Sequence, residues 1–191
     1  MYRDFIKPLL DFILALILVL ILLPILILIS IFIFFRMGTP ILYRQTRMGK
    51  NLNSFTIYKF RSMVNDADKI GSYSTASGDA RITPLGQFLR KTSLDELPQV
   101  LNVLKGEMSF IGPRPDLPAQ KEQYPDEESW VGRHKVRPGI TGLSQVRFRS
   151  SSTLAERRET DLEYAQNLSF WLDVRILIDT VFVVLKRKNT N

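Results

Sequence analysis

The chain of 191 residues contains no cysteine and only one histidine, His134. The absence of cysteine excludes disulfides and thiolate metal sites, and it fits a reducing compartment. A single histidine cannot build a histidine metal site or a Ser/His/Asp triad. We therefore assign His134 no role and expect it at the surface or in a loop.

Acidic residues are outnumbered by basic ones. Lysine and arginine number 26 against 19 aspartate and glutamate residues, which gives a formal net charge of +7 and a pI of about 9.8. A basic chain favours an anionic partner, here a lipid headgroup, a nucleotide or a nucleic acid. The length suits one ordinary domain with an appendage.

Charge is missing altogether between Phe12 and Phe35, where the chain consists almost wholly of leucine, isoleucine, valine and phenylalanine. A signal peptide does not fit, because the run exceeds the usual length of about 7 to 15 residues and no small-residue cleavage site follows. The run therefore predicts a membrane anchor, which we delimit as residues 1–36, ahead of a soluble domain at residues 37–191.

The composition leaves two modes of insertion open. As one straight helix the run would be roughly 36 Å long, enough to cross a hydrocarbon core of about 30 Å. Pro24 lies at its midpoint, however, and two arms of roughly 18 Å each could dip into one leaflet and return. The positive-inside bias places the C-terminal flank in the cytosol, but the N-terminal flank is basic too.

A charged block from Arg90 to Pro115 carries a chemical signal. Because Pro98 has no N–H, a regular α-helix that contains it is capped no earlier than Asp95. Asp95 and Glu96 then belong to a helix N-terminus, where the helix dipole favours the ionised carboxylate and attracts a phosphate or a metal-bound anion. Asp95 is a candidate nucleophile or metal ligand, and the ordinary alternative is that it caps the helix.

Several basic side chains are candidates for holding an anion. Arg114 stands between two prolines that restrict its backbone, so it is either a preorganised phosphate clamp or half of a structural salt bridge. Lys59 and Arg61 would share one face of a strand and grip one anion, or form a solvated basic edge. Arg147 and Arg149 would line one side of a segment that we expect to be extended.

The remaining patterns indicate an α+β fold that is mainly helical. We expect a short β-hairpin at Ile41–Tyr43 with Phe55–Phe60, a helix started by Thr83 at residues 83–91, and a helix ended by Gly106 at residues 95–105. We also expect a buried strand at Met108–Ile111, a solvated amphipathic helix at Leu154–Gln166, and a last helix at Leu168–Lys188 that lies at the membrane interface or over the core. We assign no chemistry to Asp116–Arg133.

The chain resembles the bacterial sugar transferases in their small form, the monotopic phosphoglycosyl transferases. The resemblance rests on the apolar run with Pro24, Tyr58–Met63, Arg90–Pro115, Arg137–Gln145 and Asn167–Phe170. It implies transfer of a sugar 1-phosphate from a UDP-sugar to a polyprenyl phosphate such as undecaprenyl phosphate. UMP would be released, Mg²⁺ would be required, and the reaction would be the first membrane step of glycan or glycoprotein assembly.

The resemblance also implies roles for single residues. Asp95 matches the family nucleophile, which forms a covalent phosphosugar intermediate and lies near the Mg²⁺, and Glu96 matches its partner in a dyad. Three arginines match phosphate-contacting residues: Arg90, Arg114 and Arg149. The chain departs from the family at Phe148, where a glycine often precedes the third arginine, and Arg147 stands ahead of it.

The family resemblance implies a topology as well. Its members use a re-entrant membrane helix, broken here at Pro24, so both ends of the anchor would face the cytosol. The soluble domain would then lie on the cytosolic face of the bacterial inner membrane. A membrane-tethered module that binds nucleic acid or anionic lipid without catalysis is the alternative suggested by charge, but the chain has no nucleic-acid recognition motif. No motif specifies the sugar or an oligomeric state.

Overall fold

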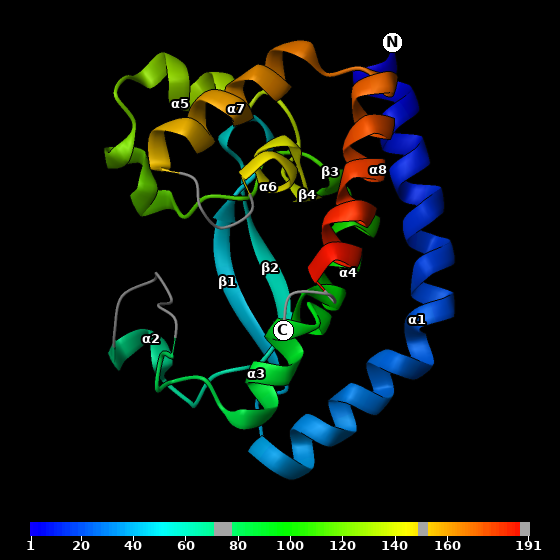
Figure 1. Cartoon of the computed structure of the whole chain (residues 1–191), viewed down its shortest axis with the longest axis vertical. Coiled ribbons are helices and arrows are strands. Elements are labelled where there is room, and N and C mark those ends of the chain that lie inside the picture. The colour runs from blue at the N-terminus through cyan, green and yellow to red at the C-terminus, as the bar shows by residue number, and fades with distance from the viewer. Residues whose placement is uncertain (71–77, 149–152, 188–191) are drawn as a thin grey trace.

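The structure is a computed structural model that describes residues 1–70, 78–148 and 153–187 (Figure 1). Its α-helices are α1 (Lys7–Met37), α2 (Ala67–Ile70), α3 (Pro84–Lys91), α4 (Val100–Leu104), α5 (Glu127–Arg133), α6 (Leu143–Phe148), α7 (Leu154–Asn167) and α8 (Phe170–Arg187). Its strands are β1 (Leu42–Met48), β2 (Ser54–Phe60), β3 (Ser109–Ile111) and β4 (Gly139–Thr141). A π-helical turn at Tyr2–Ile6 and 3-10 turns at Lys50–Leu52, Leu94–Gln99 and Pro118–Gln123 complete the described elements.

The apolar run forms most of α1, which continues through Pro24 without a break. The segment Tyr2–Met37 is long and apolar enough to cross a membrane. Figure 1 shows the axis of α1 turning partway along its length. A proline inside a helix removes one backbone hydrogen bond and kinks the axis. The expected helix-break-helix is therefore wrong in detail, because the helix bends and keeps its helical hydrogen bonding on both sides of the proline.

Both halves of α1 pack against the same domain. The first half contributes Ala15 to a cluster that includes Ile57 of β2 and Val103 of α4. The second half contributes Ile33 to another cluster that includes Leu89 of α3. The helix therefore lies along the domain, as Figure 1 shows, while most of its large apolar side chains stay exposed.

A buried ion pair fastens the start of α1 to the start of α8. Lys7 Nζ lies 2.7 Å from Asp173 Oδ2, and both side chains are almost fully buried. The hydroxyl groups of Tyr2 and Tyr164 each donate a further hydrogen bond of 2.7 Å to the Asp173 carboxylate. A buried charge needs such partners to offset its desolvation. Lys7, in the basic flank ahead of the apolar run, is thus held inside the domain.

The two sheets are small. β1 and β2 form the expected antiparallel hairpin, with Leu42 opposite Phe60 and Met48 opposite Ser54, so its first strand extends well past the expected range. β3 confirms the buried strand and pairs in parallel with β4, which the sequence did not predict. A Cβ on Gly139 would lie 2.1 Å from the Gly112 nitrogen, so only glycine allows these backbones to approach.

Three sequence expectations about the C-terminal half are wrong. The segment with Arg147 is the helix α6, not an extended strand, because Leu143 and Val146 lie on one helical face and pack into the core. The helix α7 is not a solvated surface, since it buries Tyr164. His134 is 3% exposed, because its ring packs 4.2 Å from that of Trp130 and its Nδ1 lies 2.7 Å from the Trp130 carbonyl oxygen.

The last helix, α8, matches the expected element. Its Ile176 side chain is fully buried, whereas Trp171 and Phe182 lie on a large exposed apolar face. Figure 1 shows α8 running beside the first part of α1, in agreement with the Lys7–Asp173 ion pair. Apolar side chains that the domain leaves uncovered therefore gather on both helices.

Candidate active site

Asp95 and Glu96 lie in the first turn of the 3-10 turn Leu94–Gln99, which precedes α4. We expected a regular α-helix that begins at or near Asp95, and this is wrong. Ser93 occupies the N-cap position in a left-handed conformation with φ of 58°, and no side chain caps the turn. Asp95 is thus not a helix cap, and α4 is too short for its dipole to explain the charge of the site.

Asn102 of α4 fixes this turn against the hairpin. Its side chain is fully buried, accepts a hydrogen bond of 3.1 Å from the Tyr58 backbone N–H and donates one of 2.7 Å to the Thr56 carbonyl. These bonds pair a helix side chain with the backbone of β2 where a neighbouring strand is missing. The carboxylates are thereby held close to Lys59, the next residue of β2. Gly106, with φ of 74°, ends α4 as predicted.

Glu96 is the most strongly paired carboxylate of the site. Its Oε1 lies 2.6 Å from Lys59 Nζ and 3.1 Å from Arg114 Nη2. Burial by itself would raise the pKa of Glu96, but the two cations outweigh it and lower the pKa to about 2. Burial and the nearby Arg114 in turn lower the pKa of Lys59. Glu96 therefore carries a permanent negative charge near neutral pH.

Asp95 has the opposite electrostatic character. It is 8% exposed, and burial together with the neighbouring Glu96 charge raises its pKa to about 6, against the opposing influence of Lys59 and Arg90. A carboxylate with this pKa is about 90% ionised at pH 7 and more basic than an ordinary aspartate. Asp95 thus combines an available lone pair with a poorly solvated site, which is the condition of an activated nucleophile.

Arg90 reaches the site from the C-terminal end of α3. Thr83 caps the other end of this helix by accepting a 3.0 Å hydrogen bond from the Gly86 N–H, as its sequence predicted. α3 packs so tightly that a Cβ on Gly86 would lie 1.8 Å from the Ser62 carbonyl oxygen. Arg90 Nε donates a 2.8 Å hydrogen bond to Ser62 Oγ, just after β2. This bond orients the Arg90 guanidinium.

Arg114 is positioned through its backbone. Its carbonyl oxygen accepts hydrogen bonds of 2.5 Å from Arg133 and 3.2 Å from Arg157, both at Nη2. Arg133 pairs with the buried Asp116 and Asp161 at 2.9 and 2.8 Å, and Arg157 pairs with Asp116 at 2.7 Å. The side chains of Arg133 and Asp161 in this network are at most 2% exposed. The network holds the Arg114 backbone in place and leaves the Arg114 side chain 46% exposed.

This buried network is the feature that the sequence analysis missed in Asp116–Arg133. The segment is rich in charge, and charge in a sequence usually marks a solvated surface. Its partners Asp161 and Arg157 lie on α7, far along the chain, so the pairing is not visible in local spacing. The only signal was the clustering of arginine and aspartate in two separate polar segments.

The structure brings together five of the six predicted site residues. Asp95, Glu96, Lys59, Arg90 and Arg114 form the cluster, joined by the contacts and charge effects given above. The sixth, Arg149, lies outside the described residues. Two neighbours of the predicted residues are elsewhere: Arg61 binds the carbonyl oxygens of residues 37–39 at the end of α1, and Arg147 pairs with Glu163 at the surface. Lys59 and Arg61 therefore do not grip one anion together.

The donor set of the cluster fits Mg²⁺ better than a transition metal. Among the described residues, no group of three or more histidine, cysteine, aspartate or glutamate side chains is placed to hold a metal ion. Mg²⁺ often binds through one or two protein carboxylates and completes its coordination with water and substrate phosphate oxygens. Among the described residues, no cation lies within ion-pair distance of Asp95, so its carboxylate is the one that would be available to such an ion.

Comparison with known proteins identifies the family. The family model for bacterial sugar transferases matches residues 2–187. The chain belongs to the bacterial sugar transferase family. The match covers α1, the 3-10 turn that carries Asp95 and Glu96, and α8. The cluster therefore lies within the part of the chain that defines the family.

Curated relatives of this family member share much of its sequence. It is 46% identical over 150 residues to the UDP-glucose:undecaprenyl-phosphate glucose-1-phosphate transferase of Escherichia coli (strain K12), covering 75% of the chain and 32% of that protein. It is 41% identical over 150 residues to the uncharacterized sugar transferase EpsL of Bacillus subtilis (strain 168), covering 78% of the chain and 72% of that protein. A UDP-N-acetylgalactosamine-undecaprenyl-phosphate N-acetylgalactosaminephosphotransferase of Aeromonas hydrophila is 42% identical over 150 residues, covering 76% and 36%. The chain thus spans about a third of the first and third of these relatives.

The opposite pKa shifts of the two carboxylates predict opposite effects on stability. Folding raises the pKa of Asp95 from 3.8 to about 6, so ionisation of Asp95 destabilises the folded protein progressively as pH rises through this interval. Folding lowers the pKa of Glu96, so its charge stabilises the folded protein above its ordinary pKa of 4.5. At pH 8, Asp95→Asn is expected to raise the free energy of unfolding by about 1 to 3 kcal/mol, and Glu96→Gln to lower it.

Denaturant titration of the detergent-solubilised variants at pH 8 and pH 4 measures this difference. The gain from Asp95→Asn should shrink toward zero at pH 4, where the aspartate of the parent protein is protonated in the folded state. A loss of stability at pH 8 in Asp95→Asn would contradict the electrostatic description of the site.

Proposed function

We propose that this protein transfers a sugar 1-phosphate from a UDP-sugar to a polyprenyl phosphate and releases UMP. The observation that carries the proposal is the buried Asp95, whose pKa is about 6, beside a glutamate held by Lys59 and Arg114. The names of the relatives support the reaction class, since they specify undecaprenyl phosphate as acceptor. Those names differ in the sugar, so the proposal extends to the class of donor and not to one sugar.

The chemistry proceeds in two displacements at phosphorus. An Asp95 carboxylate oxygen attacks the phosphorus that bears the sugar, a bond to the aspartate forms, and the bond to the bridging oxygen breaks, so UMP leaves with the electron pair. A phosphate oxygen of the acceptor then attacks the same phosphorus and displaces the Asp95 carboxylate. The product is a polyprenyl diphosphate sugar, and Asp95 is regenerated. Two steps allow the hydrophilic donor to leave before the lipid acceptor reacts.

The basic residues neutralise the charge that opposes each step. A carboxylate and a pyrophosphate are both anions, so attack requires cations arranged in advance around the reacting phosphorus. Arg114 has a half-exposed guanidinium on a loop held by buried ion pairs, and Arg90 is directed by its bond to Ser62. We assign phosphate binding to these two arginines and to Lys59. Glu96 orients Lys59 and Arg114 and raises the basicity of Asp95 through its own negative charge.

Mg²⁺ is the proposed cofactor, with Asp95 as a protein ligand. When bound, the ion would withdraw charge from the donor's phosphate oxygens and stabilise the departing UMP. Asp95 is suited to this position because its carboxylate is anionic near neutral pH, and Glu96 is not available in the same way while it binds Lys59 and Arg114. Asp95 would therefore lie next to the ion and to the reacting phosphorus.

We propose that the anchor is monotopic and re-entrant, with the domain on the cytosolic face of the bacterial inner membrane. Both halves of α1 pack on one domain, and Lys7 at its start is buried against Asp173. A helix that crossed the bilayer would separate its two ends by the thickness of the membrane. The exposed apolar surfaces of α1 and α8 would instead enter the same leaflet, where the polyprenyl acceptor resides.

Loss of UMP release on removal of the Asp95 carboxylate tests the reaction. In Asp95→Asn, UMP release from a UDP-sugar panel with undecaprenyl phosphate and Mg²⁺ is expected to fall at least about 1,000-fold, because the amide is not a nucleophile. The matched control is Asp126→Asn, an exposed aspartate that caps α5 and should retain normal turnover. Full turnover by a folded Asp95→Asn protein would refute the assignment of the nucleophile.

Labelling of introduced cysteines tests the topology, because the chain has no cysteine of its own to give background. Phe5 is 75% exposed near the start of the anchor, and Lys91 is exposed on the soluble domain. In intact spheroplasts, a membrane-impermeant maleimide is expected to label neither Phe5→Cys nor Lys91→Cys until the cells are permeabilised. Labelling of Phe5→Cys alone before permeabilisation would show a spanning helix.

A further inference from the structure

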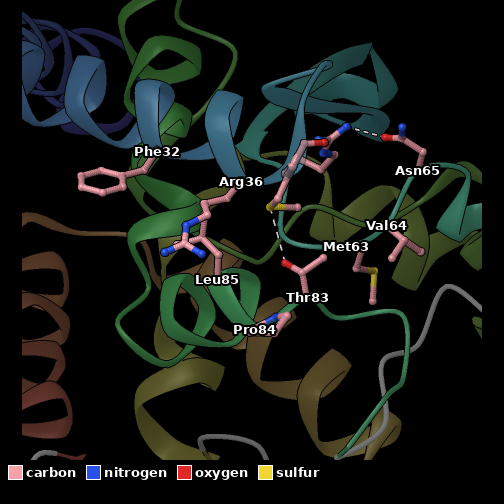
Figure 2. A pocket seen from close by; sticks show the side chains of 10 residues that line it. Phe32, Arg36, Met63, Val64, Asn65, Thr83, Pro84 and Leu85 are labelled. Carbon is pink, nitrogen blue, oxygen red and sulfur yellow. Dashed lines mark hydrogen bonds between the residues drawn. The ribbon is translucent and has the colours of Figure 1, made fainter.

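A cavity of about 770 Å³ lies where the end of α1 meets the end of β2 and the start of α3 (Figure 2). Ligand cavities in proteins usually measure about 300 to 1,000 Å³, so this space accommodates a small molecule or part of a larger one. The catalytic mechanism given above uses none of the side chains that line it. Its principal lining residues are Phe32, Arg36, Met63, Val64, Thr83 and Leu85.

The lining is apolar and cationic. Phe32, Met63, Val64 and Leu85 supply hydrocarbon, and no aspartate or glutamate is among the described residues that line the cavity. Arg36 is exposed and forms no ion pair with the residues that the structure describes. Figure 2 shows Arg36 extending from α1 toward Leu85. An unpaired guanidinium beside hydrocarbon walls favours a ligand that has both an anionic group and an apolar portion.

Two segments of the chain connect the cavity to the charged cluster. Arg61 and Met63 line it, and Ser62 between them accepts the hydrogen bond from Arg90 Nε. Thr83 lines the cavity at the start of α3, and Arg90 lies at the other end of the same short helix. The end of β2 and the helix α3 therefore contribute both to the cavity and to the position of Arg90 in the active site.

The C-terminal half of α1, which we call the membrane arm, forms another wall of the cavity. Phe32 and Arg36 are four residues apart, so they share one face of α1. Apolar side chains elsewhere on this arm remain exposed, and they include Leu28 and Phe35. A ligand that leaves the cavity along α1 thus passes onto a hydrocarbon surface, which suits a lipid chain and does not suit a sugar nucleotide.

We propose that this cavity binds the acceptor, holding the phosphate of a polyprenyl phosphate near Arg36 and its first isoprene units against Phe32, Val64 and Leu85. The inference rests on the proposed function, because that function identifies the lipid phosphate as a substrate. It goes further by separating the acceptor site from the donor phosphates at Arg114 and Lys59. The cavity is too small for a whole polyprenyl chain, so the distal units continue along the exposed face of α1.

Steady-state kinetics of cavity variants in nanodiscs of phosphatidylethanolamine and phosphatidylglycerol test the proposal. Arg36→Gln and Phe32→Ala are each expected to raise the KM for undecaprenyl phosphate about tenfold and to leave the KM for the UDP-sugar unchanged. The matched controls are Arg175→Gln, on an 80% exposed arginine of α8, and Phe34→Ala, on the same arm but outside the cavity lining. An unchanged acceptor KM in both cavity variants, or an equal rise in both substrates' KM values, would overturn the proposal.

Photocrosslinking gives a measurement that does not depend on turnover. A polyprenyl phosphate with a diazirine in its first isoprene unit is expected to label residues 32–37, 63–65 or 83–85, and excess undecaprenyl phosphate should prevent the labelling. Labelling at these positions in a protein that shows no transferase activity would support the acceptor site and count against the proposed reaction. Labelling elsewhere, or competition by excess phosphatidylglycerol as effective as that by undecaprenyl phosphate, would refute a specific acceptor site.

Discussion

The ion pairs of Glu96 with Lys59 and Arg114 connect the three parts of the chain that make up the site. Lys59 comes from the hairpin, Arg114 from the loop after β3, and Glu96 from the turn before α4. A carboxylate shared by two cations stays ionised, and burial together with this charge raises the pKa of the adjacent Asp95. The cluster therefore fixes the geometry of the site and contributes to the proton affinity of the proposed nucleophile.

The rest of the structure supports this cluster from two sides. Buried pairs between Arg133 and the aspartates Asp116 and Asp161 hold the loop of Arg114, so its guanidinium is presented without a large loss of conformational freedom on binding. On the other side, α1 packs along the domain, and the ion pair between Lys7 and Asp173 holds its start in place. We propose that the water-soluble donor and the lipid acceptor reach Asp95 from different sides of this cluster.

Much of this arrangement follows from the sequence where a residue type dictates local geometry. Thr83 with Pro84 predicted a helix start, Gly106 a helix end, and Pro98 kept Asp95 and Glu96 at the beginning of a helical segment. The 3-10 geometry was not predictable from local spacing, because the turn itself packs against β2, which lies far from it in the sequence.

Tertiary packing explains the other differences. The expected solvated helix buries Tyr164, the expected strand near Arg147 is helical, and His134 is buried against Trp130. Tyr164 has a partner distant in sequence, because its hydroxyl donates a hydrogen bond to the Ile111 carbonyl oxygen, and local spacing carries no information about that partner. His134 is buried by Trp130 four residues earlier, where the burial depends on how α5 packs in the domain. The cavity at Arg36 is a further example, since three separate segments form it.

We propose that Asp95 becomes covalently attached to the sugar phosphate during turnover. Intact-protein and peptide mass spectrometry after rapid acid quench, with UDP-sugar and Mg²⁺ present and no acceptor, can detect this adduct. We expect an added sugar phosphate on the peptide that contains Asp95, with UMP released in equal amount and the adduct lost when polyprenyl phosphate is added. Normal turnover without any such adduct, or an adduct on another residue, would show that Asp95 is not the nucleophile.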